Sequence, residues 1–149
     1  FIVGVGDAAL SAIPKSIRRE AIRVDQAKVR LPITDTKMKL MLAEELLRQY
    51  RERARLVITS KIHCAMPCIA MGIPVVFLYG DHKKDDYRVK VVKDLIGINY
   101  VRQEGVLATI INAGKQREID WSPSVPDIED TKKEIVDRFL LEFSRVHEG

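Results

Sequence analysis

Residues 55–81 read RLVITSKIHCAMPCIAMGIPVVFLYGD, and this stretch decides the fold. Its pattern predicts a buried strand over 56–58, then a helix of small residues over 63–71 that ends at Gly72, then a second buried strand over 75–78. Both strands are continuously apolar, which is typical of a parallel sheet whose two faces are covered.

A group of polar residues, Thr59, Ser60, Lys61 and His63, follows the first of these strands directly. It stands between the carboxyl end of a strand and the amino end of a helix, where ligands bind in open α/β sheets. Free backbone N–H groups and the helix dipole favour negative charge there. Taken singly, His63 is also explained as a structural histidine and Lys61 as a solvated surface lysine. Their shared position favours an anion site with hydroxyl donors, a cation and an imidazole.

The rest of the chain alternates between strand and helix patterns. We expect further elements in the following ranges: strands over 1–5, 21–24 and 100–101, a helical turn over 14–19, and helices over 36–53, 85–96, 105–113 and 127–146. The alternation predicts a three-layer, Rossmann-like α/β fold with a mostly parallel sheet, formed by residues 1–149 as a single domain.

Two of the predicted helices carry one-sided apolar stripes. The first stripe consists of Met38, Leu42, Leu46 and Tyr50, and the second of Ile128, Ile135, Phe139 and Phe143. Each stripe gives its helix one apolar face.

Composition narrows the classes of function. Hydrophobic residues make up 46% of the chain and charged residues 31%, as in ordinary globular proteins. The net charge of +4 comes from basic residues interleaved with acids, so we expect no nucleic-acid partner. No apolar run approaches the ~20 residues of a membrane helix, and no signal peptide is evident. Because Phe1 already lies in a strand pattern, we expect the chain to be a piece of a longer protein.

The two cysteines, Cys64 and Cys68, lie one helical turn apart. Among small apolar neighbours they are expected to pack in the core, because a zinc site would need further ligands. This use of cysteine is typical of a reducing, cytoplasmic compartment. No metal site is predicted.

Three further features lie near the predicted site. Arg88 follows the second buried strand, in the first turn of the next helix, and is a candidate second anion contact; the alternative is a charged surface loop. Gly4-Val5-Gly6 is interpreted as a plain turn, since it lacks the third glycine of a dinucleotide fingerprint. Pro67 deprives the His63 carbonyl of its helix partner, or else lies in the first turn of a helix that starts late.

Residues 57–77 closely resemble a run typical of polysaccharide pyruvyl transferases, ITSRLH-x-x-x-P-x-x-A-x-G-x-PVV. The resemblance implies the C-terminal, donor-binding lobe of a two-lobe enzyme similar to GT-B glycosyltransferases. Members of this family transfer a pyruvyl ketal from phosphoenolpyruvate to a sugar. Their Arg-x-His pair, implicated in binding the donor, corresponds to Lys61 and His63. Lysine keeps the charge of the usual arginine but loses its planar fork.

The leading hypothesis is therefore a pyruvyltransferase-like lobe without a cofactor, whose partners are a small anionic donor, a cell-surface or exopolysaccharide sugar, and an N-terminal lobe absent from this chain. Lys61 would hold phosphate or carboxylate, Ser60 would donate a hydrogen bond, and Arg88 would be a second clamp. His63 would act as a general acid or as a phosphate clamp. The alternatives are a GT-B glycosyltransferase lobe that binds a nucleotide-sugar, and a non-catalytic domain that kept the fold.

Overall fold

A computed structural model describes residues 1–25, 35–80, 89–104, 107–112 and 119–147 of the chain. Within these ranges six strands form one sheet in the order β2-β1-β3-β4-β5-β6. The strands are β1 (Ile2–Val3), β2 (Arg23–Val24), β3 (Val57–Thr59), β4 (Val75–Gly80), β5 (Asn99–Glu104) and β6 (Leu107–Asn112). The helices are α1 (Asp7–Ala12), α2 (Lys15–Glu20), α3 (Thr36–Arg53), α4 (Ile62–Ala70), α5 (Lys90–Ile96) and α6 (Glu129–His147).

The first five strands are all parallel, and their order 2-1-3-4-5 is Rossmann-like. In the register of the sheet, Ile58 of β3 lies between Ile2 of β1 and Val76 of β4. This arrangement confirms the predicted α/β class and its mostly parallel sheet.

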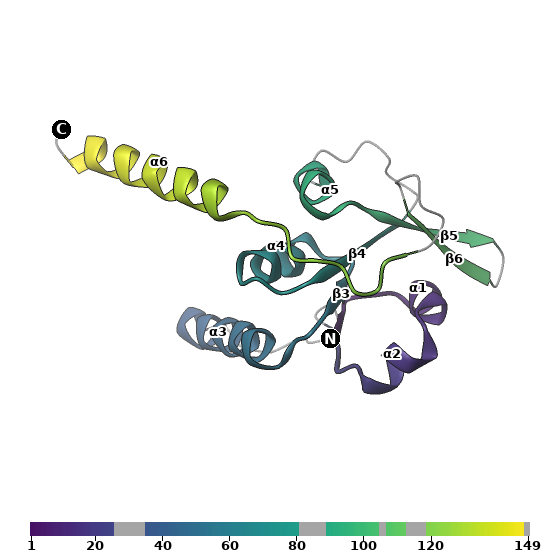
Figure 1. Ribbon diagram of the computed structural model, residues 1–149. Coiled ribbons are helices and arrows are strands. Elements are labelled where there is room, and N and C mark those ends of the chain that lie inside the picture. Colours follow the sequence, from purple (N-terminus) through teal and green to yellow (C-terminus); the bar gives the residue numbers. More distant parts are fainter. Residues whose placement is uncertain (26–34, 81–88, 105–106, 113–118, 148–149) are drawn as a thin grey trace.

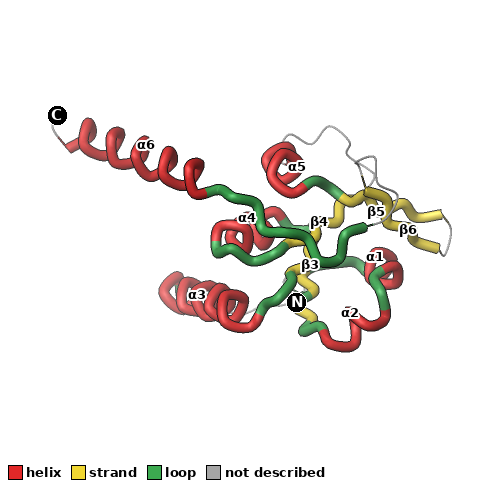
Figure 2. The backbone as a smooth tube through the Cα atoms, viewed as in Figure 1, coloured by secondary structure: helices red, strands yellow, loops and turns green. Residues whose placement is uncertain are grey.

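Alternate residues of each strand enter two different cores, because successive side chains of a strand point to opposite faces. On one face Val57 and Phe77 pack with residues of α3, α4 and α5. On the other face Ile58 and Leu78 pack with α1, α2 and the segment around Trp121. Figures 1 and 2 show the resulting three layers, with the sheet between the two groups of helices.

The predicted helix over 105–113 is wrong. The described part of this range is β6, which pairs antiparallel with β5 at the edge of the sheet. Its sequence includes Thr109, Ile110 and Ile111, whose branched side chains suit a strand better than a helix. These residues and the edge of β5, which offers backbone hydrogen bonds, favour a strand, although a glycine typical of helix ends follows in the sequence.

The bounds of α3 agree with the prediction, and only the second half of its apolar stripe is buried or partly buried. Asp35 caps the helix by accepting hydrogen bonds from the backbone N–H groups of Lys37 at 2.7 Å and Met38 at 3.4 Å. Tyr50, near the other end, is 1% exposed, whereas Met38 is 50% exposed. The amino-terminal half of α3 thus extends beyond the core that its other half joins.

Most of the apolar stripe of α6 is exposed. Ile128, just before the helix, packs against the core, but Ile135 and Phe139 are each 64% exposed and Phe143 is 54% exposed. Figure 1 shows α6 projecting away from the body of the protein.

Most other boundaries agree with the sequence to within two residues, but β1 is shorter than the strand predicted over 1–5 and β5 is longer than the one predicted over 100–101. Gly72 and Gly97 follow α4 and α5 with φ values of +74°, as expected of helix-ending glycines. Pro67 is the sixth residue of α4, so the alternative that placed it in a first turn is wrong. The start of the helix predicted over 85–96 lies outside the described residues. None of the helices in the described ranges is long and apolar enough to cross a membrane.

Candidate functional site

The predicted polar group lies at a topological switch point of the sheet. Strands β1 and β3 are neighbours in the sheet, and the helices that follow them, α1 and α4, pack on opposite faces. The loops that follow β1 and β3 therefore diverge at the carboxyl end of the strands, and such a divergence creates the crevice in which open α/β sheets bind ligands.

Two hydroxyl groups tie the end of β3 to the end of β1. Thr59, which is fully buried, donates a hydrogen bond to the Val3 carbonyl at 2.9 Å and accepts one from the Lys61 backbone N–H at 3.0 Å. Ser60 donates to the Gly4 carbonyl at 2.6 Å. In this structure the protons of both hydroxyls are engaged within the protein. Their direct role is to hold the two loops together.

Lys61 is the residue at which the chain turns from β3 into α4. Its φ of −110° and ψ of 118° are extended, and its carbonyl accepts the first bonds of the helix, from Cys64 and Ala65. A lysine has no acceptor to cap a helix, so its side chain leaves the first N–H groups of α4 uncapped. The side chain is exposed and forms no ion pair with the residues that the structure describes.

His63 is the second residue of α4 and is also exposed. Pro67 supplies no N–H to its carbonyl, as expected from the sequence. The structure therefore brings Ser60, Lys61 and His63 together at one junction. Arg88, the fourth predicted site residue, lies outside the described residues.

Gly4 is a member of this junction that the sequence interpretation missed. It follows β1 with a φ of +58°, which favours glycine, and the methylene stem of Lys61 lies directly over it. A Cβ atom at position 4 would lie 2.8 Å from Cε and 2.9 Å from Cγ of Lys61. The turn after Gly4 leads into α1, a helix of only six residues. A glycine after an apolar pair was visible in the sequence, but its neighbour across the sheet was not.

The two cysteines belong to the core behind the junction, as predicted. Cys64 and Cys68 are free thiols that are 2% and 0% exposed, and they pack with Tyr50 of α3. A hydrogen bond with Cys64, together with burial, raises the pKa of the Cys68 thiol. Burial also raises the pKa of the Tyr50 hydroxyl. The Cys68 thiol and the Tyr50 hydroxyl therefore stay protonated near neutral pH, whereas the hydrogen bond with Cys68 lowers the pKa of the Cys64 thiol to about 7.

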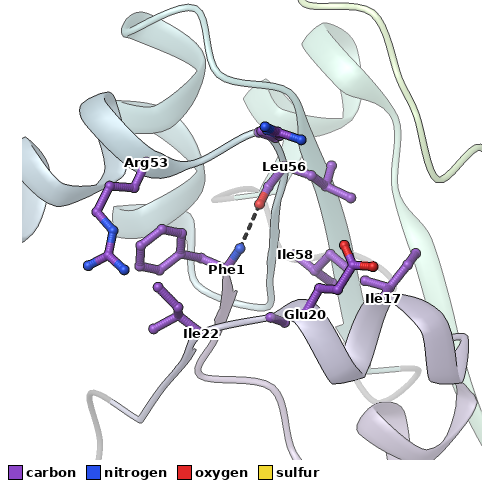
Figure 3. A pocket seen from close by; sticks show the side chains of 9 residues that line it. Phe1, Ile17, Glu20, Ile22, Arg53, Leu56 and Ile58 are labelled. Carbon is purple, nitrogen blue, oxygen red and sulfur yellow. Dashed lines mark hydrogen bonds between the residues drawn. The ribbon is translucent and has the colours of Figure 1, made fainter.

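A cavity of about 360 Å³ lies at the opposite, amino end of the strands (Figure 3). Phe1, Ile22, Leu56 and Ile58 form much of its wall, with Arg53 at its side. The backbone nitrogen of Phe1 donates to the Leu56 carbonyl at 2.8 Å beside it. This cavity does not include any of the predicted site residues.

Neither the side chains in the described ranges nor known proteins indicate a second site. Within the described ranges, no group of three or more His, Cys, Asp or Glu side chains is arranged to hold a metal ion. No family model, curated protein or solved structure gives a significant match to the chain. The resemblance of residues 57–77 to polysaccharide pyruvyl transferases therefore stays a prediction from the sequence.

Proposed function

We propose that the chain is the donor-binding lobe of a pyruvyltransferase-like enzyme, with phosphoenolpyruvate bound at the junction of β3 and α4. The observation that carries the proposal is the position of Lys61 and His63 at a switch point of a Rossmann-like sheet, at the amino end of a helix with an uncapped first turn. The family-like run over 57–77 supports the choice of donor.

The chemistry of phosphoenolpyruvate suits this junction. The donor carries a phosphate and a carboxylate, and Lys61 offers an exposed cation without a carboxylate partner among the described residues. Backbone N–H groups at the start of α4 add donors and a favourable dipole. His63 lies within the first turn of the same helix, where it would either protonate the enol carbon of the donor or hold its phosphate.

We propose a positioning role for Ser60 in place of the direct contact predicted from the sequence. Its hydroxyl donates a hydrogen bond to the Gly4 carbonyl, so donating to a ligand would require that hydrogen bond to break. Arg88 remains a proposed second clamp. The acceptor would be a sugar of a cell-surface polysaccharide or exopolysaccharide, bound with the help of a second lobe.

The test is an NMR titration of this chain with phosphoenolpyruvate, followed through the imidazole signals of His63. A saturable shift that a nucleoside diphosphate does not produce is the expected result. Lys61→Gln should weaken binding about tenfold or more, because hydrogen bonds between charged groups are worth about 1.5–3 kcal/mol. Lys133→Gln, a change at an exposed lysine of α6, the helix that projects away from the body of the protein, is the matched control and should bind as the wild type does.

The other outcomes identify the alternatives. Saturation by the nucleoside diphosphate alone would move the assignment to a glycosyltransferase lobe. A folded chain that responds to neither ligand would contradict donor binding by this lobe. In an enzyme that contains both lobes, unchanged turnover of His63→Ala would contradict a catalytic role for His63.

A further inference from the structure

We infer that Gly4 is a positioning residue for Lys61: its missing side chain leaves the space through which the lysine stem reaches the β1 side of the junction. The inference rests on the proposed function for its link to donor binding. It assigns part of the site to the loop after β1, a segment distant in sequence from the family-like run.

The first observation is the close approach of the two residues. A Cβ atom on Gly4 would lie within 3.4 Å of three consecutive stem carbons, Cγ, Cδ and Cε of Lys61. The stem therefore runs across Gly4 along most of its length. Since Nζ is bonded to Cε, the ammonium group is held beside the loop that follows β1.

The second observation is that Gly4 cannot easily move away. Its N–H donates to the Val24 carbonyl of β2 at 2.9 Å, and its carbonyl accepts from the Ser60 hydroxyl at 2.6 Å. The backbone of Gly4 is thus held from both neighbouring strands. A methyl group at position 4 would displace the flexible lysine stem, because the bonded backbone resists movement more than the stem does.

The chain offers a matched control for the positive φ of Gly4. Gly72 has a φ of +74°, and a Cβ atom built on it would meet nothing within 4 Å. Gly4→Ala and Gly72→Ala should both lower the folding equilibrium constant by about tenfold, since each puts a side chain in left-handed backbone. The lysine contact is lost only in Gly4→Ala.

The first arm of the test needs no ligand. In the wild-type chain, NMR should show NOEs between the α-protons of Gly4 and the γ and ε protons of Lys61. The Lys61 side-chain signals should shift in Gly4→Ala and stay in place in Gly72→Ala. Absence of the NOEs, or equal Lys61 shifts in the two variants, would overturn the inference.

The second arm measures affinity for phosphoenolpyruvate. Gly4→Ala should weaken binding by a factor close to that of Lys61→Ala, and the double variant should bind no more weakly than Lys61→Ala alone. Gly72→Ala should bind as the wild type does. Wild-type affinity in Gly4→Ala would overturn the inference. If the wild type binds no phosphoenolpyruvate, the proposed function fails, and the ligand-free arm still decides whether Gly4 positions Lys61.

Discussion

At the carboxyl end of the parallel strands, side-chain hydrogen bonds join two loops, whereas the amino end has a cavity lined by apolar and charged side chains. At the carboxyl end, Thr59 and Ser60 bond to the carbonyls of Val3 and Gly4. At the amino end, a cavity of about 360 Å³ lies against Phe1 and its neighbours. The cavity, which Glu20, Arg53 and Arg55 also line, is therefore not where Lys61 and His63 lie.

The cavity and the predicted site thus lie at opposite ends of the strands. Hydrogen bonds have strict geometry, so the hydroxyls of β3 fix the positions of two loops relative to each other. Apolar contacts lack direction, and the walls of a cavity are held mainly by the packing behind them. We therefore expect the carboxyl end to be the more exactly positioned end, as a binding site requires.

The largest effect is expected at the amino end, from Ile58→Ala. Ile58 is 1% exposed, belongs to the core on the α1 side and also contributes to the cavity wall. Its truncation would enlarge an existing void, and we expect a loss of about 2–5 kcal/mol in the free energy of unfolding, measured by denaturant titration. Ile58→Val is the control, with an expected loss of about 0.5–1.5 kcal/mol. A loss smaller than about 2 kcal/mol in Ile58→Ala would mean that neighbouring side chains move in to fill the void.

A smaller effect is expected at the carboxyl end, from Thr59→Val. The change keeps the shape of the side chain but leaves the Val3 carbonyl without its donor and the Lys61 N–H without its acceptor. We expect a loss of about 1–3 kcal/mol in the free energy of unfolding, together with a shift of the Lys61 amide signal. Thr59→Ser retains the hydroxyl and should keep that signal near its wild-type position. If Thr59→Val is as stable as the wild type, the two ends do not differ as described.

The smallest effect concerns a surface ion pair on α3, the helix that leads into the amino end. Hydrogen bonds from Arg48 lower the pKa of Glu45 from 4.5 to about 2. Because this carboxyl has a lower pKa in the folded state, its stabilising contribution is present above pH 4.5 and is lost as the pH falls toward 2. The contribution should be small and sensitive to salt, since the pair is exposed.

NMR titration of the Glu45 carboxyl checks this prediction. Arg48→Gln should return its midpoint toward 4.5, and 1 M salt should have a smaller effect in the same direction. The same low midpoint in Arg48→Gln would show that Arg48 is not the cause.

Local sequence signals were strong enough to define most of the sheet and the position of the site. The continuous apolar runs of β3 and β4 predicted parallel strands, and the polar residues after β3 predicted the junction that Lys61 and His63 occupy. These features depend on neighbours along the chain, so they are visible without the fold. Strand β6 was missed because its pairing with β5 outweighed a helix-ending glycine nearby.

The amphipathic helices show what local sequence signals do not determine. Tyr50 and Met38 belong to one predicted stripe, yet only Tyr50 is buried. Phe139 lies in an equally regular stripe and is 64% exposed. Periodicity specifies that a helix has an apolar face, but whether another element covers that face depends on the three-dimensional arrangement.

By itself, the sequence determined the α/β class, the parallel core strands and the residues that form the β3–α4 junction, because each follows from local periodicity and chemistry. Only the tertiary structure decided that Thr59 and Ser60 bond to β1, that the stem of Lys61 lies over Gly4, and that the cavity opens at the other end of the sheet. These contacts join residues more than fifty positions apart, and parallel strand pairing alone brings them together.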